Sequence, residues 1–167
     1  MAVGGLGANG SGVSAMRLKD GDLNKMSRVL NHGSVSLSEN IDMLYNAMYT
    51  ETSFRGSDKK DEKWLTIGVR PMYYWNDIMS TAVELGYDQV KNAIDNDGTG
   101  SAKDSRVSKI TVAQQWSAGR GTFARPQIRA FGTYAKWNKD SMGKVGGDAY
   151  ALDTDGYTFG VQMEAWW

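Results

Sequence analysis

The side chains that could carry out chemistry are few and lie far apart in the sequence. The chain of 167 residues has one histidine, His32, and no cysteine, which excludes a histidine-based triad, a multi-histidine metal site and a thiolate site. The carboxylates that could pair as general acid and base are Asp42, Glu84, Asp88 and Glu164. They fall on the polar faces of predicted strands, where contact with water accounts for them. The sequence therefore predicts no enzyme, no metal site and no cofactor.

Three short motifs suggest ligand binding but lack the context that it needs. Residues 5–10 match G-x-G-x-x-G, yet neither a preceding strand nor a following helix is predicted around them. The DNDG and DTDG sequences at 95–98 and 153–156 resemble parts of calcium loops without the full spacing and closing glutamate. Asp and Gly are also ordinary turn residues. We expect turns at both positions, with a loop-bound cation as the less favoured alternative.

Two aromatic residues do not fit a lipid-facing or core-facing position. Trp166 falls among the polar positions of the last predicted strand, and Phe123 lies in the glycine-rich turn at 119–126. Exposed aromatic rings in a wet channel can stack on sugar rings, while charged side chains bond the hydroxyl groups. Charged residues with suitable polar-face positions are Arg70, Glu84, Arg129 and Glu164. From the residues alone, the simpler interpretation is that Trp166 ends a strand and Phe123 fills a turn.

The elements that must position these residues are β-strands. In residues 157–167, apolar and polar side chains alternate, with Trp166 as the one exception, so one face is apolar and the other polar. The same period of two recurs along the chain, and no helical stripe is found. The predicted strands are 26–37, 41–51, 63–75, 79–91, 106–117, 127–137 and 157–167, with a weaker one at 10–16.

The predicted connections alternate between short and long. Residues 38–40 and 76–78 are short turns, whereas 52–62, 92–105 and 138–156 are longer and polar, and 118–126 is intermediate. Antiparallel meanders with short turns at one end and long loops at the other are typical of transmembrane β-barrels. Tyr and Trp residues near strand ends suit the two membrane interfaces. They are Tyr45, Tyr49, Trp64, Tyr73, Tyr74, Trp75, Tyr87, Trp116, Tyr134, Trp137, Tyr157 and Trp167.

Composition narrows the alternatives. The formal net charge is zero, which gives no electrostatic reason to expect a nucleic-acid partner. No segment approaches the roughly twenty apolar residues of a membrane helix. A transmembrane β-barrel and a soluble β-barrel or sandwich binding module both remain compatible with the residues, and the alternating connections favour the transmembrane barrel.

Several motifs together resemble the C-terminal part of the maltoporin-like outer-membrane sugar porins. They are RVLNHGSVS (28–36), VRPMYYW (69–75), IMST (78–81), ELGYD (84–88), KITVAQQW (109–116), ARPQIR (124–129), TYAKW (133–137) and TFGVQMEAWW (158–167). They occur in order over nearly the whole chain, which makes the resemblance specific.

The resemblance implies an all-β fold, an antiparallel transmembrane barrel of eighteen strands that assembles as a homotrimer in outer-membrane lipid. It also implies passive, sugar-selective diffusion of maltodextrin-type oligosaccharides or related glycosides along a line of aromatic side chains. Phe123 and Trp166 fall where the family has such aromatics, with Phe123 in place of an expected tryptophan. The resemblance therefore changes the preferred interpretation of both residues to sugar contacts. A general diffusion porin without sugar preference is the alternative.

The chain accounts for only part of such a barrel. Seven or eight strands are under half of eighteen, and the first residues show no charged segment followed by an apolar run, as a secretory signal would require. We therefore expect residues 1–167 to be one segment of a porin barrel, a truncated chain without the N-terminal half and signal peptide. Unpaired strand edges would cost several kcal/mol for each bare peptide group in lipid.

Overall fold

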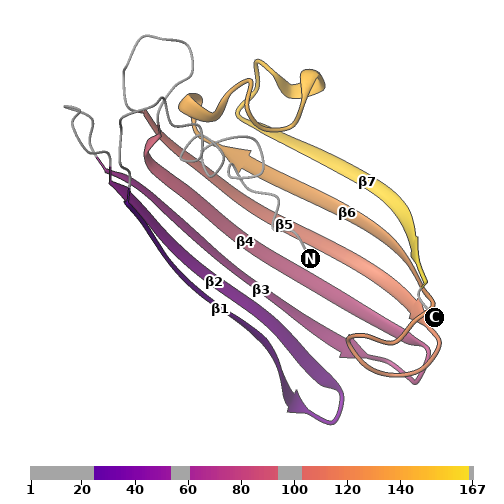
Figure 1. Cartoon of the computed structure of the whole chain (residues 1–167). Coiled ribbons are helices and arrows are strands. Elements are labelled where there is room, and N and C mark those ends of the chain that lie inside the picture. Colours follow the sequence, from indigo (N-terminus) through magenta and orange to yellow (C-terminus); the bar gives the residue numbers. More distant parts are fainter. Residues whose placement is uncertain (1–24, 54–60, 94–102, 166–167) are drawn as a thin grey trace.

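The structure is a computed structural model that describes residues 25–53, 61–93 and 103–165. These residues form one seven-stranded antiparallel sheet in which the spatial order of the strands follows the chain (Figure 1). The strands are β1 (Lys25–Ser38), β2 (Ile41–Ser53), β3 (Glu62–Tyr74), β4 (Met79–Ala93), β5 (Lys103–Ser117), β6 (Gln127–Trp137) and β7 (Asp155–Glu164). Two 3-10 turns, η2 (Lys139–Ser141) and η3 (Asp148–Tyr150), lie between β6 and β7, and no helix in the described ranges is long and apolar enough to cross a membrane. The predicted all-β, antiparallel fold is confirmed.

The observed strands differ from the predicted ones mainly at their ends. β7 starts at Asp155 and ends at Glu164, which lies opposite Gln127 at the start of β6. The prediction that this strand continues to the C-terminus is wrong at Ala165, where pairing with β6 has already stopped. The last two residues and the weaker predicted strand at 10–16 lie outside the described residues.

The sheet is curved, and its concave face buries the polar side chains. On β4 the buried residues include Ser80, Ala82, Glu84 and Asp88, whereas Leu85 on the opposite face is 47% exposed. A soluble sheet with one buried face would bury the apolar set instead. The alternation is therefore the one predicted from the sequence, with its polar side turned inward.

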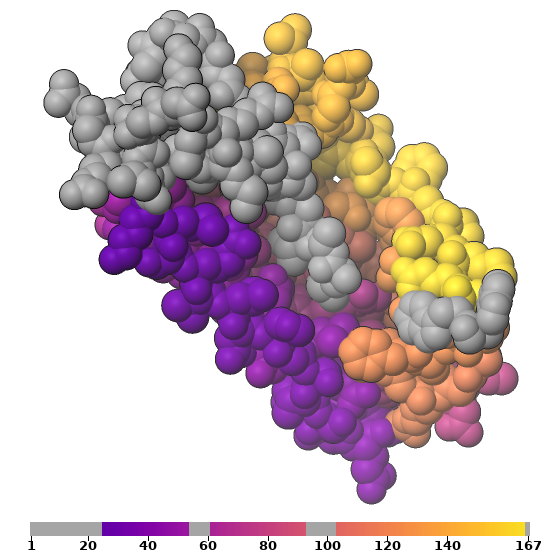
Figure 2. Space-filling model, in the orientation of Figure 1, coloured from indigo at the N-terminus to yellow at the C-terminus, as the bar shows by residue number. Residues whose placement is uncertain are grey.

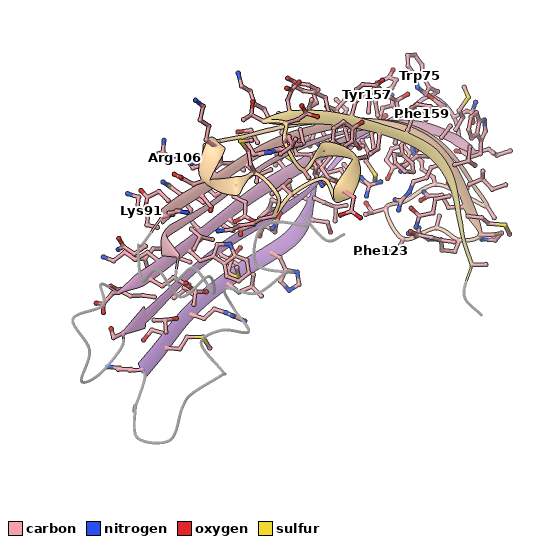
Figure 3. The ribbon with its side chains drawn as sticks, turned by 90° about the horizontal axis from the view of Figure 1, so that it is seen from above. Trp75, Lys91, Arg106, Phe123, Tyr157 and Phe159 are labelled. Carbon is pink, nitrogen blue, oxygen red and sulfur yellow. The ribbon has the colours of Figure 1, made fainter. Side chains whose placement is uncertain are left out.

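In the described residues, the convex face is apolar and exposed. Tyr157, Phe159, Val161 and Met163 of β7 are between 66% and 82% exposed. Figure 3 shows Tyr157 and Phe159 on the outer side of the curved sheet, together with Trp75. A continuous exposed apolar face needs an apolar partner. Lipid hydrocarbon on this side and water on the concave side fit the two faces of a transmembrane barrel wall.

Some of the aromatics assigned to the membrane interfaces point the other way. Tyr74 and Trp137 are 6% and 4% exposed on the concave side, and the Trp64 indole N–H donates to the buried Asp88 carboxylate at 2.5 Å. The interface assignment is therefore wrong for these three residues. Their positions share the parity of the polar residues on their strands, and that parity decides the direction better than nearness to a strand end.

The connections separate into two ends of the sheet, as expected. Residues 39–40, 75–78 and 118–126 join strands at one end, and the β6–β7 connection lies at the opposite end (Figure 1). At this second end Val90, Val107 and Trp137 form an apolar cluster on which Tyr150 of the β6–β7 connection packs. The long connection is thus fixed to the concave side, and the Trp137 indole N–H donates to the Asp153 carbonyl at 2.7 Å.

The opposite polarity of the two faces predicts opposite responses to an added charge at the middle of β2. Ala47 is on the exposed convex face, and its neighbour Asn46 is on the concave face. We expect Ala47→Arg to destabilise the folded protein in phosphatidylcholine bilayers by about 2–4 kcal/mol, because it places a cation in hydrocarbon. Asn46→Arg should cost less than about 1 kcal/mol, because its side chain stays in water. Equal losses, measured by urea titration, would contradict the assignment of the faces.

Candidate functional site

The concave face contains a groove that is lined by residues of the neighbouring strands β3 to β7. Figure 2 shows this face, hollowed between the indigo strands β1 and β2 and the yellow strand β7. The groove has a volume of about 320 Å³. It is lined by Arg70, Ala82, Glu84, Lys109, Thr111, Ala113, Arg125, Arg129, Phe131, Thr133, Gln162 and Glu164. All of these except Arg125 lie on strands, and Arg125 belongs to the β5–β6 connection.

Small side chains form the base of the groove. Ala82 of β4 pairs with Ala113 of β5, which pairs with Phe131 of β6. One step along the same strands, Thr111 and Thr133 are cross-strand partners and share a hydrogen bond of 2.7 Å between their hydroxyl groups. Because the ladder aligns the short alanine and threonine side chains, space remains above them for a ligand beside the Phe131 ring.

Charged residues surround this base in two ion-paired groups. The Lys109 ammonium lies 2.9 Å from the Glu84 carboxylate. Glu164, the last residue of β7, accepts from two guanidinium groups, Arg125 at 2.6 Å and Arg129 at 2.9 Å. Arg129 also donates to the Gln162 side-chain oxygen at 2.6 Å. Charge-assisted bonds of this kind hold planar groups in fixed orientations.

The β5–β6 connection crosses the concave side. Its Arg120 donates to the Glu39 carbonyl and to the Asn40 side chain in the β1–β2 turn, and its guanidinium lies 5.1 Å from the centre of the Tyr74 ring. Neighbouring strands are about 4.8 Å apart, so this contact joins strands separated by about 19 Å along the sheet. The connection is therefore held at both sides, by Arg120 at β1–β2 and by Arg125 at β7.

Phe123 lies between these two anchors. It is 68% exposed, and Figure 3 shows it on the concave side, opposite to Tyr157 and Phe159. Most of this apolar ring is therefore exposed on the concave side rather than buried by the described part of the chain. It is available to a ligand that enters from the concave side.

The structure brings most of the predicted site residues together. Arg70, Glu84, Arg129 and Glu164 all line the groove. Phe123 is two residues from Arg125 in the anchored connection, and Trp166 lies outside the described residues. Sequence reasoning missed Lys109, Phe131 and Arg125. The alternation of β5 and β6 would have placed the first two on the concave face, but a loop residue such as Arg125 has no such signal.

The remaining candidates for chemistry have separate partners. Asp42 accepts from the Ser36 hydroxyl at 2.7 Å and from the Tyr74 hydroxyl at 2.8 Å, far along the chain from Glu84 and Glu164. Asp155 of the DTDG sequence is the first residue of β7, so the predicted turn at 153–156 is wrong at its last two residues, and Asp155 accepts from the Tyr134 hydroxyl at 3.2 Å. Within the described ranges, no group of three or more His, Cys, Asp or Glu residues could hold a metal ion.

The Arg120 anchor predicts a local effect on the β5–β6 connection. Arg120→Ala removes two hydrogen bonds to the β1–β2 turn, and one charge-assisted bond contributes about 1.5 kcal/mol or more. We expect amide hydrogen exchange in residues 118–126 to become about tenfold faster, measured by mass spectrometry in detergent micelles. Arg106→Ala, at an exposed arginine outside the groove, is the matched control. Unchanged exchange in residues 118–126 would show that the connection does not depend on Arg120.

A comparison with protein families agrees with this geometry. The sheet has an apolar outer face, a polar inner face with a charged groove, and short turns at one end, which together are features of a porin wall. The family model described as LamB porin matches residues 3–167. Members of that family are outer-membrane transport channels. The match covers nearly the whole chain, and the chain therefore belongs to the LamB porin family.

Proposed function

We propose that this chain forms part of the wall of a sugar-selective diffusion channel in the outer membrane. The observation that carries the proposal is the exposed ring of Phe123, held by an anchored connection beside a charged groove on the watery face. Maltose, maltodextrins and related oligosaccharides or glycosides are the substrate class. The channel needs no catalytic residue, because the substrate passes down its own concentration gradient.

A sugar offers two kinds of surface, and the concave face matches both. The C–H faces of a sugar ring are apolar and can stack on an aromatic ring such as Phe123. Its hydroxyl groups can bond to carboxylates, guanidinium groups and amides, which the groove supplies through Glu84, Glu164, Arg129 and Arg70. We place Trp166 in the same line of aromatics. Binding at each position must be weak, because conduction requires sites that also release the substrate.

The described sheet is open, and we propose that further strands close it into a barrel. In the described ranges β1 and β7 are the edge strands and do not pair with each other. Each edge would otherwise present unpaired peptide groups to lipid, at several kcal/mol for each group. In this proposal the chain is a single segment of a larger barrel, and the complete barrels associate as homotrimers.

The stacking role predicts the effect of shortening Phe123. In planar bilayers, maltose should block the ion current of the wild-type channel. We expect Phe123→Ala to raise the half-blocking concentration about tenfold, which corresponds to about 1.4 kcal/mol, while the conductance without sugar stays close to that of the wild type. Phe123→Trp should lower the half-blocking concentration, because it enlarges the stacking face.

The control for this series is Tyr157→Ala, which removes an aromatic ring from the convex face. It should leave the block by maltose unchanged. Trp166→Ala is expected to weaken the block in the same way as Phe123→Ala. A wild-type channel whose current is not blocked by sugar would be a general diffusion pore and would overturn the proposal. If neither aromatic substitution changes the half-blocking concentration of maltose, Phe123 and Trp166 are not part of the sugar-binding site.

A further inference from the structure

We propose that the groove favours sugars that carry a negative charge, and that Arg70 is the residue that binds the charged group. The inference rests on the proposed function, since it names the substrate class of the same channel. It concerns a subsite beside Phe131, separate from the two aromatics discussed above. The class is that of acidic sugars, in which a phosphate or carboxylate group is attached to the ring.

The first observation is an excess of positive charge. Four cationic side chains line the groove, namely Arg70, Lys109, Arg125 and Arg129, against two carboxylates, Glu84 and Glu164. The lining therefore carries two positive charges in excess. A concave site with one sign of charge concentrates ions of the opposite sign.

The second observation is how these charges pair. Glu84 is bound by Lys109, and both oxygens of Glu164 are bound, one by Arg125 and the other by Arg129. Arg70 has no hydrogen bond or ion pair with any residue in the described part of the chain. Both carboxylates of the groove are thus occupied by other cations, and the five N–H donors of Arg70 remain available to a ligand.

The third observation is the position of Arg70 in its strand. Arg70 is half-buried on the concave face of β3 and precedes Pro71, which has no N–H to donate. The pairing of β3 with β4 is interrupted here, between Val69–Leu85 and Met72–Ala82. Arg70 lies on β3, at the edge of the groove farthest from β7, and lines the groove together with the small residues of its base.

A stacking surface lies across this base. Phe131 lines the groove from β6, and its ring packs against Gly160 of β7, where a Cβ atom would come within 3.2 Å of the ring. Glycine at 160 thus leaves room for the ring to lie close to the sheet. A sugar ring on Phe131 could reach Gln162 and Arg129 with its hydroxyl groups and Arg70 with an anionic substituent. Guanidinium groups bind phosphate and carboxylate through two parallel hydrogen bonds, a geometry that a neutral hydroxyl cannot reproduce.

The test compares maltose with maltose 1-phosphate as blockers of the purified channel in planar bilayers. We expect the phosphate ester to block at a concentration about tenfold lower than maltose. Arg70→Gln should bring the ratio of the two half-blocking concentrations close to one. Arg70→Lys, which keeps the charge but loses the planar fork, should give an intermediate ratio.

Arg28→Gln is the matched control. Arg28 is also on the concave face and donates to the Thr50 hydroxyl at 3.2 Å, but it does not line the groove. The Arg28→Gln substitution also removes one positive charge from the pore. It should leave the ratio of the half-blocking concentrations of maltose and maltose 1-phosphate unchanged. Phe131→Leu should weaken the block by both sugars to a similar extent.

Each remaining outcome has a distinct meaning. Block by maltose without any preference for the ester would overturn this inference and leave the proposed function standing. If Arg70→Gln and Arg28→Gln lose the preference for maltose 1-phosphate to the same extent, the preference comes from the overall charge of the pore and not from a subsite at Arg70. Block by inorganic phosphate as strong as that by the ester would overturn the role of the sugar ring. No block by any sugar would overturn the proposed function itself.

Discussion

The structure depends on the side-chain alternation of β-strands between two environments of opposite polarity. Within a ladder, each residue is fixed opposite its partner, so a polar side chain such as Glu84 cannot leave the concave face without moving Leu85 as well. Because each strand from β1 to β7 pairs with the next one in the chain, the same constraint sets the inner face of all described strands. The apolar convex face, the polar concave face and the groove all follow from it.

Side-chain ion pairs and hydrogen bonds around the groove fix the β5–β6 connection, which the backbone hydrogen bonds of the sheet do not hold. Glu164 at the end of β7 binds Arg129 on the neighbouring strand and Arg125 in the β5–β6 connection. Arg120 fixes the same connection to the β1–β2 turn. A loop that would otherwise extend away from the sheet is therefore held across the concave side, and the exposed ring of Phe123 is held there with it.

The sequence was sufficient for the strands and for much of the groove, because both depend on a period of two. That period placed Arg70, Glu84, Arg129 and Glu164 on the polar face, and the structure gathers them in one groove. The same period also turns Trp64, Tyr74 and Trp137 to the concave face, and it overrides the preference of Trp and Tyr near strand ends for the membrane interfaces. The contacts of Arg120 and Arg125 could not be predicted, because a connection has no fixed side-chain direction and its path depends on partners distant in the sequence.

The central claim is that the polar face borders water and the apolar face borders lipid. The chain contains no cysteine, so single cysteines introduced along β5 can be labelled without background. In proteoliposomes, a charged thiol reagent should label Lys109→Cys and Thr111→Cys, which are partly exposed in the groove on the concave side. It should fail to label Ile110→Cys and Val112→Cys, which face the convex side. Labelling of all four positions, or of the convex pair alone, would contradict the account.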